Sequence, residues 1–527
     1  MGGGSSKNAP AQEAVDTSKE QAALETSLKS KISGAIKVGD WTKFYTRKYD
    51  LGTGMSGVVF LVQLNSDPTQ TFACKSIAKG RLQHDEIDDL RAEIALCASL
   101  DHPNIVKIVE SFESDHDITM VMELCKGGEL YDSLIDEGSY SQRRAAELFQ
   151  MMAQAVNYCH QVGVVHRDLK LENFVFESKP TTQSTLKLID FGLSVKHVGS
   201  KGIRKMKSVV GTAYYMAPEV LDSKKSYDSK CDVWGLGVIL FMMLTGSPPF
   251  NGSSERSIMK RASEGKVDWS SWRHGVDFSD AKDLIKRMLV PADRRFTAEQ
   301  VLQHKWLARM SQHSTDRIHA DVVSALSNFS KKGKLYRSSA QIIAVKLSPS
   351  ELHELQAQFQ VMDADSSGTI SLEEFKKAIA GSSQKIDEAE LDSMFNSIDL
   401  DGTGLISYSE FLSATLSTTD KMTTDRLNTA FDTLDPDGSG SIETSELKGL
   451  LSEFADDVEI EKILDSVDAD HNHQISRDEF LALCMDNTHT AKVEAALQLH
   501  LSDRSETSSS VRTEPLDEDV APTNTED

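Results

Sequence analysis

Residues whose types and spacing suit the transfer of a phosphoryl group lie between positions 165 and 192. In the run Val165–Asn173, Asp168 is placed to accept the proton of an attacking hydroxyl, and Lys170 follows where it can contact the transferred phosphate. Asn173, and Asp190 in the sequence Asp-Phe-Gly, each offer an oxygen to a metal ion. Since negative charge builds up on the phosphate oxygens in the transition state, two Mg²⁺ ions and one lysine are what this reaction needs. These motifs predict ATP and Mg²⁺ as cofactors.

A glycine-rich segment, Leu51–Val58, precedes these motifs and has the composition of a loop that lies over nucleotide phosphates. Its glycines lack a Cβ, so the backbone N–H groups can approach the phosphates closely. Lys75, seventeen residues after this segment, is predicted to hold the α- and β-phosphates, with Glu93 as its ion-pair partner. The alternative partners that remain open are Glu86, Asp88 and Asp89.

A twelve-residue acidic loop occurs four times in the second half of the chain, at intervals of 36, 36 and 33 residues. Oxygen ligands fall at positions 1, 3, 5, 7, 9 and 12, with a backbone carbonyl at position 7 and a bidentate glutamate at position 12, as in an EF-hand calcium loop. The pattern predicts four Ca²⁺ sites. Their ligands are Asp363, Asp365, Ser367, Thr369, Ser371 and Glu374; Asp399, Asp401, Thr403, Leu405, Ser407 and Glu410; Asp435, Asp437, Ser439, Ser441, Glu443 and Glu446; and Asp468, Asp470, Asn472, Gln474, Ser476 and Glu479.

The four loops are predicted to join two by two and to differ in strength. Position 8 is isoleucine in every loop, which favours a short antiparallel strand pair between two loops. Four loops that pair in this way form two lobes. The third loop has four carboxylates, including Glu443, and more charge favours tighter calcium binding. The fourth has His473 where glycine is usual, so this residue must adopt a positive φ at a cost of about 1 kcal/mol. The isoleucines are Ile370, Ile406, Ile442 and Ile475.

Charge separates the chain into regions. Residues 45–308 carry 33 Lys+Arg and 34 Asp+Glu, whereas residues 346–527 carry 12 and 40. Between them, residues 309–345 carry 6 and 2, so a basic connector separates a neutral region from an acidic one. The acidic region repels nucleic acid, which we exclude as a partner, and attracts divalent cations.

Hydrophobic periodicity indicates a small sheet over residues 45–130 and helices over residues 140–308. The longest apolar run, Val233–Leu244, is too short to span a bilayer and is predicted to form a buried helix. The connector has amphipathic helical spacing, with apolar residues at Val322, Leu326 and Phe329. The six cysteines form no CxxC pair, which argues against a disulfide framework or a zinc site and fits a reducing compartment.

In their order and spacing, the motifs of residues 45–308 resemble the protein kinase superfamily. His166–Lys170 and Gly211–Tyr215 are similar to serine/threonine kinases, and Gly127–Leu130 is similar to calmodulin-dependent relatives. A kinase followed directly by EF-hands resembles the calcium-dependent protein kinases of plants and protists over residues 45–485. This resemblance implies an α+β fold: a bilobal kinase with a β-rich N-lobe and a helical C-lobe, then an all-α calmodulin-like domain of two EF-hand pairs.

The resemblance also implies site residues. Glu129 and Glu172 would favour basic substrates, and Thr212 belongs to the substrate site. Ser208 stands where family members often carry an acidic residue, so it is a candidate phosphorylation site; the alternative is a plain exposed serine. Arg295 is expected to pair with Glu219. The nucleotide site would comprise Leu51, Gly52, Thr53, Gly54, Gly57, Val58, Lys75, Met122, Glu123 and Cys125.

The expected function is a calcium-activated serine/threonine kinase whose cleft is blocked by the connector until calcium binds. Lys331, Lys332, Lys334 and Arg337 of the connector could meet Glu129 and Glu172, although no pseudosubstrate is evident. One alternative is a calcium-responsive scaffold that binds nucleotide without significant turnover. Another is an always-active kinase that its EF-hands only localise.

The expected organisation is an unstructured extension over 1–44, the kinase over 45–308, an autoinhibitory junction over 309–347, EF-hand lobes over 348–417 and 418–490, and an acidic tail over 491–527. The start of the chain fits the N-myristoylation pattern at Gly2. A single acyl chain gives only weak, reversible membrane attachment. We therefore expect a monomer in the cytoplasm, partly at the cytoplasmic face of a membrane.

Overall fold

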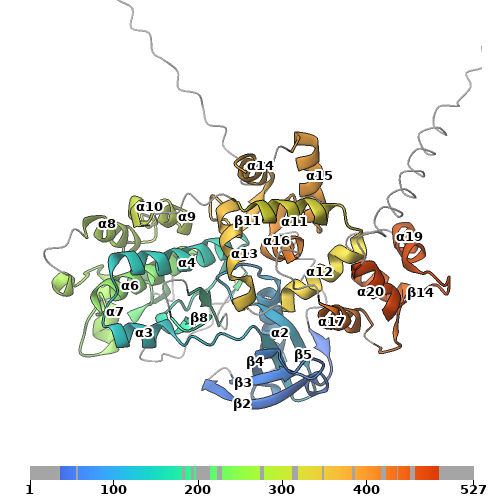
Figure 1. The fold of residues 1–527 in the computed structure, drawn as a ribbon. Helices are drawn as coiled ribbons and strands as arrows, with labels where there is room; N and C mark the ends of the chain where they lie inside the picture. Colours follow the sequence, from blue (N-terminus) through green and yellow to red (C-terminus); the bar gives the residue numbers. More distant parts are fainter. Residues whose placement is uncertain are drawn as a thin grey trace, which may run out of the picture.

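The computed structural model describes residues 36–54, 57–82, 84–180, 184–190, 195–196, 214–221, 228–272, 278–310, 318–346, 349–382, 386–416, 423–435, 437–451 and 457–485. Figure 1 shows a sheet-containing lobe and a helical lobe, with a second helical region beside them. The predicted α+β class is confirmed: a β-rich N-lobe, a helical C-lobe and an EF-hand region follow one another along the chain.

The N-lobe holds, within the described residues, a six-stranded sheet of order β1-β5-β6-β4-β3-β2, with one long helix beside it. β3 and β4 lie within the region predicted to form a sheet, and each buries apolar side chains, such as Phe60 and Val62 on β3 and Phe72 on β4. Residues 36–44 differ from the prediction, which expected an unstructured segment. In the structure, Lys37–Val38 pairs in parallel with Phe112–Glu113 at the edge of the sheet. The elements are β1 (Lys37–Val38), β2 (Tyr45–Gly54), β3 (Gly57–Leu64), β4 (Thr71–Ala78), α2 (His84–Ser99), β5 (Ile108–Glu113) and β6 (Asp117–Met122).

The C-lobe is built around α4 (Gln142–Gln161) and α6 (Lys230–Thr245). Ser141 begins α4 by accepting a hydrogen bond from the Arg144 backbone N–H. The predicted apolar helix is α6, whose residues are almost all buried, and it ends at Gly246 with a φ of 70°. The other elements are α3 (Leu130–Glu137), β7 (Val164–Val165), β8 (Phe174–Phe176), β9 (Leu186–Leu188), β10 (Val195–Lys196), α5 (Pro218–Leu221), α7 (Glu255–Ser263), α8 (Ser279–Met288), α9 (Ala298–Leu302) and α10 (Lys305–Met310).

The connector forms two helices, α11 (Ala320–Ser330) and α12 (Lys334–Lys346), and the EF-hand helices follow. The break between α11 and α12 lies at residues 331–333, which include Gly333. The EF-hand elements are α13 (Pro349–Met362), β11 (Thr369–Ser371), α14 (Leu372–Ala380), α15 (Glu388–Ile398), β12 (Leu405–Ser407), α16 (Tyr408–Thr415), α17 (Thr424–Leu434), β13 (Ser441–Glu443), α18 (Thr444–Leu451), α19 (Asp457–Val467), β14 (Gln474–Ser476) and α20 (Arg477–Met485).

Buried apolar side chains fall into separate groups. One cluster fills the C-lobe and reaches α2, and a smaller one lies within the N-lobe sheet. A further cluster is shared by the connector and the EF-hand helices. All six cysteines are unpaired and five are buried. None of the helices in the described part of the chain combines the length and apolar composition needed to cross a bilayer.

Candidate functional site

The loop that carries Asp168 brings together two predicted catalytic residues, Asp168 and Lys170, and the predicted metal ligand Asn173. Lys170 Nζ lies 2.7 Å from Asp168 Oδ2, and the Asn173 side-chain amide donates to the Asp168 backbone carbonyl at 2.8 Å. The other carboxylate oxygen, Oδ1, is buried and has no hydrogen-bond partner among the described residues. A buried acceptor with an unused lone pair is suited to receive the proton of a substrate hydroxyl.

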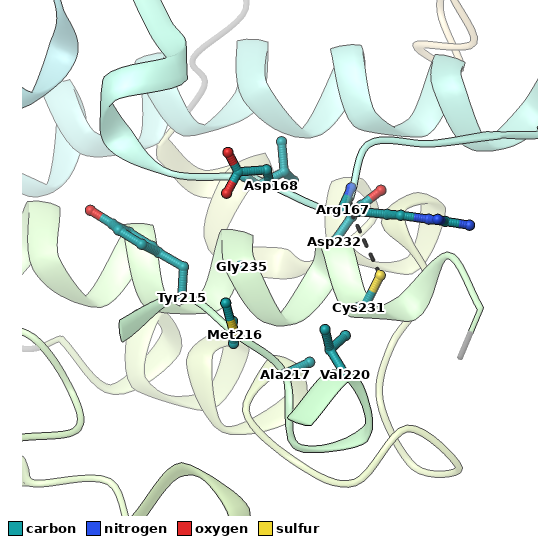
Figure 2. Close-up of a pocket in the computed structure, with 10 residues that line it drawn as sticks. Arg167, Asp168, Tyr215, Met216, Ala217, Val220, Cys231, Asp232 and Gly235 are labelled. Atoms are coloured by element: carbon teal, nitrogen blue, oxygen red, sulfur yellow. Dashed lines mark hydrogen bonds between the residues drawn. The ribbon is translucent and has the colours of Figure 1, made fainter. Parts of the chain in front are cut away.

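A residue that sequence reasoning missed, Asp232, fixes the backbone of this loop. Its carboxylate accepts hydrogen bonds from the backbone N–H groups of His166 (2.9 Å) and Arg167 (2.8 Å), and it also contacts His160 at 2.9 Å. Arg167 adopts a φ of 72°, a strained conformation that these bonds stabilise. Asp232 and Arg167 line the same small pocket as Asp168 (Figure 2). The only sequence signal was an aspartate beside the apolar run of α6.

Lys75 and Asp190 meet across the two lobes. Lys75 lies on β4, and its Nζ is 2.9 Å from Asp190 Oδ1. Asp190 has a φ of 60°, and both residues were predicted to contact the phosphates or a metal ion. Lys75 is thus paired with Asp190, and the Lys75–Glu93 pair stays a prediction. Asp190 and Asn173 carry side-chain oxygens, the ligand type that Mg²⁺ prefers, so these residue types fit the predicted metal site.

The glycine-rich segment forms the hairpin of β2 and β3, as expected. Gly57 has a φ of 138°, and a Cβ at this position would lie 2.4 Å from the Ser76 carbonyl oxygen. Only glycine therefore fits this close approach to β4. Val58 pairs with Thr53 across the hairpin, and Leu51 is exposed on β2.

Glu123, which directly follows β6 and was predicted to belong to the nucleotide site, is held by two lysines. Its Oε1 accepts from the Lys107 backbone N–H at 2.7 Å and from Lys187 Nζ at 3.0 Å. Although burial disfavours the charge, Glu123 and Glu177 keep the pKa of Lys187 above its ordinary value. Met122 and Cys125 flank Glu123 and are partly buried.

The predicted substrate-binding acids lie near each other. Burial and the neighbouring Asp132 and Glu172 carboxylates raise the pKa of Glu129. Such mutual repulsion between carboxylates is relieved by a nearby cation. Thr212 and Ser208 lie outside the described residues, as does Gly2.

The predicted Arg295–Glu219 pair is present and buried. Arg295 Nη1 lies 2.5 Å from Glu219 Oε1, and Nη2 lies 3.0 Å from Oε2, a bidentate geometry. The pair ties the start of α5 to the loop before α9, which braces the C-lobe below the catalytic loop.

Each acidic loop brings its position 1, 3 and 12 carboxylates within 4.8 Å of one another, as calcium coordination requires. In the first loop, Asp363 accepts from the Ser367 and Gly368 backbone N–H groups, and Glu374 accepts from that of Ser371. Ser371 and Glu374 also form the capping box that begins α14. The donor set and the spacing therefore fit Ca²⁺. The four groups are Asp363, Asp365 and Glu374; Asp399, Asp401 and Glu410; Asp435, Asp437 and Glu446; and Asp468, Asp470 and Glu479.

The loops are joined in pairs, as predicted. Ile370 faces Ile406 in the β11–β12 ladder, and Ile442 faces Ile475 in the β13–β14 ladder. His473 adopts a φ of 61°, which confirms the expected positive value at this position.

The apolar face of the connector is buried among the EF-hand helices. Val322, Leu326, Phe329 and Leu335 are each at most 4% exposed and share one apolar cluster with the EF-hand core. Arg337, one of the basic connector residues, donates to the Ser397 carbonyl on α15. In this structure the connector is thus bound by the EF-hand lobes.

The first EF-hand lobe also contacts the kinase half directly. Asp101, which follows α2 in the chain, accepts from the Ser409 backbone N–H and from the Ser409 hydroxyl, both at 2.9 Å. On α4, the Gln154 side chain donates to the Ser366 hydroxyl of the first calcium loop at 3.0 Å. Lys107 Nζ lies 3.3 Å from Asp101 Oδ1, so polar contacts lead from Glu123 through Lys107 and Asp101 to α16. Sequence reasoning did not find this interface.

Gly368, in the first calcium loop, packs against aromatic side chains of the kinase half. A Cβ here would lie 2.6 Å from His102 Cδ2 and 2.9 Å from Tyr158 Cδ2. Gly404, at the same position of the second loop, has a similar φ, but a Cβ there would meet no atom within 4 Å. A substitution at Gly404 therefore tests only the calcium loop, whereas the same substitution at Gly368 tests the loop and the interface together.

We expect Gly368→Ala to detach the first lobe from the kinase half, and Gly404→Ala to leave it attached. Both substitutions carry a similar backbone cost of about 1 kcal/mol, since both positions have positive φ, but only the first adds a steric clash with His102 and Tyr158. Hydrogen exchange at saturating calcium would measure this as faster exchange in α4 for the first variant alone. Equal exchange in the two variants would show that the interface does not form in solution.

Comparison with known proteins agrees with a kinase domain in the first half of the chain and with EF-hands in the second half. A family model described as a protein kinase domain matches residues 45–307, and one described as an EF-hand domain pair matches residues 353–416 and 424–485. Calcium-dependent protein kinase 33 of Arabidopsis thaliana is 40% identical over 464 residues, which are 86% of this chain and 88% of the relative. Calcium-dependent protein kinase 9 of the same plant is 38% identical over 446 residues, 84% and 81% of the two chains. Calcium-dependent protein kinase 1 of Oryza sativa subsp. japonica is 40% identical over 349 residues, 66% of each chain.

Proposed function

This chain belongs to the calcium-dependent protein kinase family, and from this we propose that its connector moves from the kinase cleft to the EF-hand lobes as calcium rises. The chain is a calcium-dependent serine/threonine kinase, with ATP and Mg²⁺ as cofactors of the kinase half and Ca²⁺ bound by the EF-hands. What remains to be proposed is how the two halves are coupled and which substrates the cleft accepts.

The burial of the connector's apolar face carries this proposal. Val322, Leu326, Phe329 and Leu335 are buried in the EF-hand core, and burial stabilises each such side chain by roughly 1.5–3 kcal/mol. EF-hand lobes open an apolar groove when they bind calcium, and such grooves bind amphipathic helices. The connector helices therefore have a strong binding partner in the calcium-loaded lobes.

In the calcium-free state, the connector occupies the kinase cleft. Its basic residues Lys331, Lys332 and Lys334 would then lie near the acids at Glu129 and Glu172, whose charges attract cations. The connector lacks a pseudosubstrate, so it blocks the cleft as a helix rather than as a mimic of the substrate. Calcium can shift the equilibrium only by its difference in affinity for the two states.

Transfer in the open state begins when Asp168 accepts the proton of the substrate hydroxyl at its free Oδ1. Lys170 and Lys75 stabilise the negative charge on the phosphate oxygens. Asn173 and Asp190 would hold Mg²⁺, which neutralises the nucleotide's phosphates when bound. Glu129 and Glu172, with Thr212, select substrates with basic residues near the phosphoacceptor.

At its N-terminus, the chain has a candidate acyl site at Gly2. We propose that myristoylation there gives weak, reversible attachment to the cytoplasmic face of a membrane, because one acyl chain alone binds marginally. Phosphorylation of Ser208 would add a second level of control.

We expect Phe329→Ala to lower the ratio of activity in calcium to activity in chelator by about 10-fold. Removing this buried ring costs about 3–5 kcal/mol of packing in the calcium-loaded state, which weakens capture of the connector. Asn328→Ala changes an exposed residue of the same helix and serves as the matched control. Phosphorylation of a basic peptide across a calcium titration measures both variants.

Two results would overturn the proposal. An unchanged ratio for Phe329→Ala would show that the connector's capture does not control activity. Equal turnover by the wild-type enzyme in chelator and in saturating calcium would favour the always-active alternative, and no turnover in either would favour the scaffold.

A further inference from the structure

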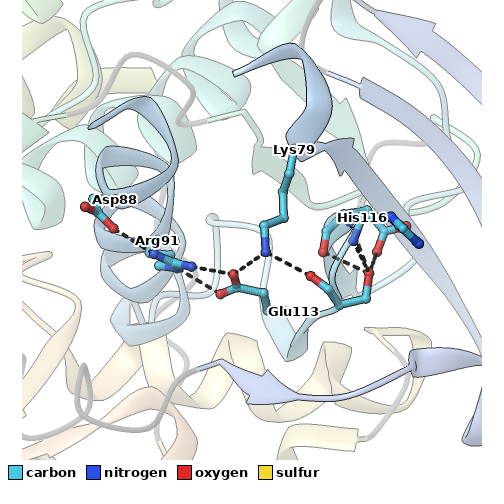
Figure 3. Close-up of polar contacts among 7 residues, drawn as sticks. Lys79, Asp88, Arg91, Glu113 and His116 are labelled. Carbon is cyan, nitrogen blue, oxygen red and sulfur yellow. Dashed lines mark hydrogen bonds and ion pairs between the residues drawn. The ribbon is translucent and has the colours of Figure 1, made fainter. Parts of the chain in front are cut away.

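One carboxylate ties the helix that carries Glu93 to the N-lobe sheet. Arg91 lies on α2, two residues before Glu93, and it binds Glu113 at the end of β5. Arg91 Nε lies 2.9 Å from Glu113 Oε2, and Nη2 lies 2.6 Å from Oε1, so the contact is bidentate (Figure 3). A bidentate arginine fixes direction as well as distance, which a single point charge does not.

The same carboxylate also holds the end of the strand that carries Lys75. Lys79 directly follows β4, and its Nζ lies 2.7 Å from Glu113 Oε1 and 2.9 Å from the Ser114 carbonyl oxygen (Figure 3). Glu113 therefore joins three elements: β5, on which it stands, α2 through Arg91, and β4 through Lys79. Two of these carry the residues predicted to form the Lys75–Glu93 pair.

The environment of Glu113 distinguishes this contact from an ordinary surface ion pair. Exposed pairs contribute only about 0–1 kcal/mol. Here the Arg91 side chain is 40% exposed, but the Glu113 side chain, which both cations share, is 15% exposed and that of Lys79 18%. The hydrogen bonds from Arg91, together with Lys79, lower the pKa of Glu113 to about 2, so the carboxylate is charged at neutral pH. The second partner of Arg91 is Asp88, an exposed residue on the same helix, which cannot link α2 to the sheet.

We propose that Glu113 is a positioning residue for phosphoryl transfer, which sets the place of α2 against β4 so that Glu93 can reach Lys75. It touches neither substrate nor nucleotide and acts through Arg91 and Lys79. The inference rests on the proposed phosphoryl transfer and on the predicted pairing of Glu93 with Lys75. Whichever carboxylate Lys75 contacts, the distance from Glu93 to Lys75 depends on where α2 lies relative to β4.

Glu113→Gln tests the proposal, with Glu110→Gln as the matched control. Glu110 lies on the same strand, but it binds Lys37 at 3.1 Å and the Tyr45 hydroxyl at 2.6 Å, neither of which lies on α2 or β4. At saturating calcium we expect Glu113→Gln to lower kcat by about 10-fold, the size of a small misplacement of catalytic groups, with the KM for the peptide unchanged. Glu110→Gln should retain kcat within about 2-fold.

Repeating the substitution in a chain that already carries Glu93→Gln distinguishes a positioning role of Glu113 from a general loss of stability. If Glu113 acts through Glu93, Glu113→Gln should cost no further activity in a chain that already carries Glu93→Gln, because coupled residues are not additive. A loss of the same size in both backgrounds would overturn the proposal. Arg91→Lys keeps the charge and loses the bidentate geometry, so it supplies a milder variant, with an expected kcat loss of about 3-fold, should Glu113→Gln fold poorly.

The same measurements also distinguish a failure of the positioning role of Glu113 from a failure of the role of Glu93. If Glu93→Gln lowers kcat and neither Glu113→Gln nor Arg91→Lys does, the positioning role of Glu113 is wrong while the role of Glu93 stands. If Glu93→Gln leaves kcat unchanged, the proposed role of Glu93 is wrong and the inference fails with it.

Discussion

Substitution of Asp168 by asparagine is expected to lower kcat by about 10³-fold, the middle of the range for a lost general base. Asparagine keeps the size of the side chain, but its amide cannot accept a proton from the substrate hydroxyl. The free Oδ1 of Asp168 is the observation behind this expectation, since Oδ2 is already bound by Lys170. Initial rates of peptide phosphorylation at saturating ATP and calcium would measure the loss.

Two controls make the Asp168→Asn result interpretable. Asp136→Asn changes an exposed aspartate on α3 and should leave the rate unchanged. Calcium binding by Asp168→Asn should match wild type, because the EF-hand loops contain no part of the catalytic loop. Activity within about 10-fold of wild type would contradict the assigned role of Asp168.

Removal of the position 12 glutamates is expected to affect the two EF-hand lobes unequally. We expect Glu374→Gln with Glu410→Gln to raise the calcium needed for half-maximal activity by about 100-fold, and Glu446→Gln with Glu479→Gln to raise it by about 10-fold; both lie within the usual range of coupling between sites. The first lobe contacts the kinase half through Ser366 and Ser409. The second lobe packs on the connector through α17 and α12, and toward the kinase half its Arg426 interacts electrostatically with Asp67.

Calcium titrations of kinase activity, with a direct calcium-binding measurement on each double variant, would test this inequality. Activity in chelator should be the same for both double variants and for wild type, because glutamine leaves the connector and the catalytic loop unchanged. Equal shifts in the two lobes would show that contact with the kinase half does not contribute to the calcium response.

The sites that depend on one short run of sequence could be predicted. Asp168, Lys170 and Asn173 lie within six residues of one another, and each calcium loop is twelve residues long, so their spacing alone restricts the geometry. The pairing of Ile370 with Ile406 could also be predicted, since it follows from a repeated position in similar loops.

Contacts between distant segments could not be predicted in the same way. Asp101 and Ser409 are 308 residues apart. The local sequence around Asp101 indicates only the end of a helix, and that around Ser409 indicates only an EF-hand helix. Asp232 binds the catalytic loop at Arg167, 65 residues earlier in the chain. The sequence shows only that Asp232 lies beside an apolar run, which does not indicate this contact. Such contacts depend on how whole elements pack, which hydrophobic periodicity does not specify.

The placement of the connector in one apolar core with the EF-hands has a consequence for engineering. The kinase half has apolar clusters of its own, and the segment from Ile318 to Cys484 shares a separate one. A graft that transfers calcium response to a different enzyme must therefore carry α11 and α12 together with the EF-hands, since a sensor cut at the start of α13 would leave an apolar groove without its native occupant.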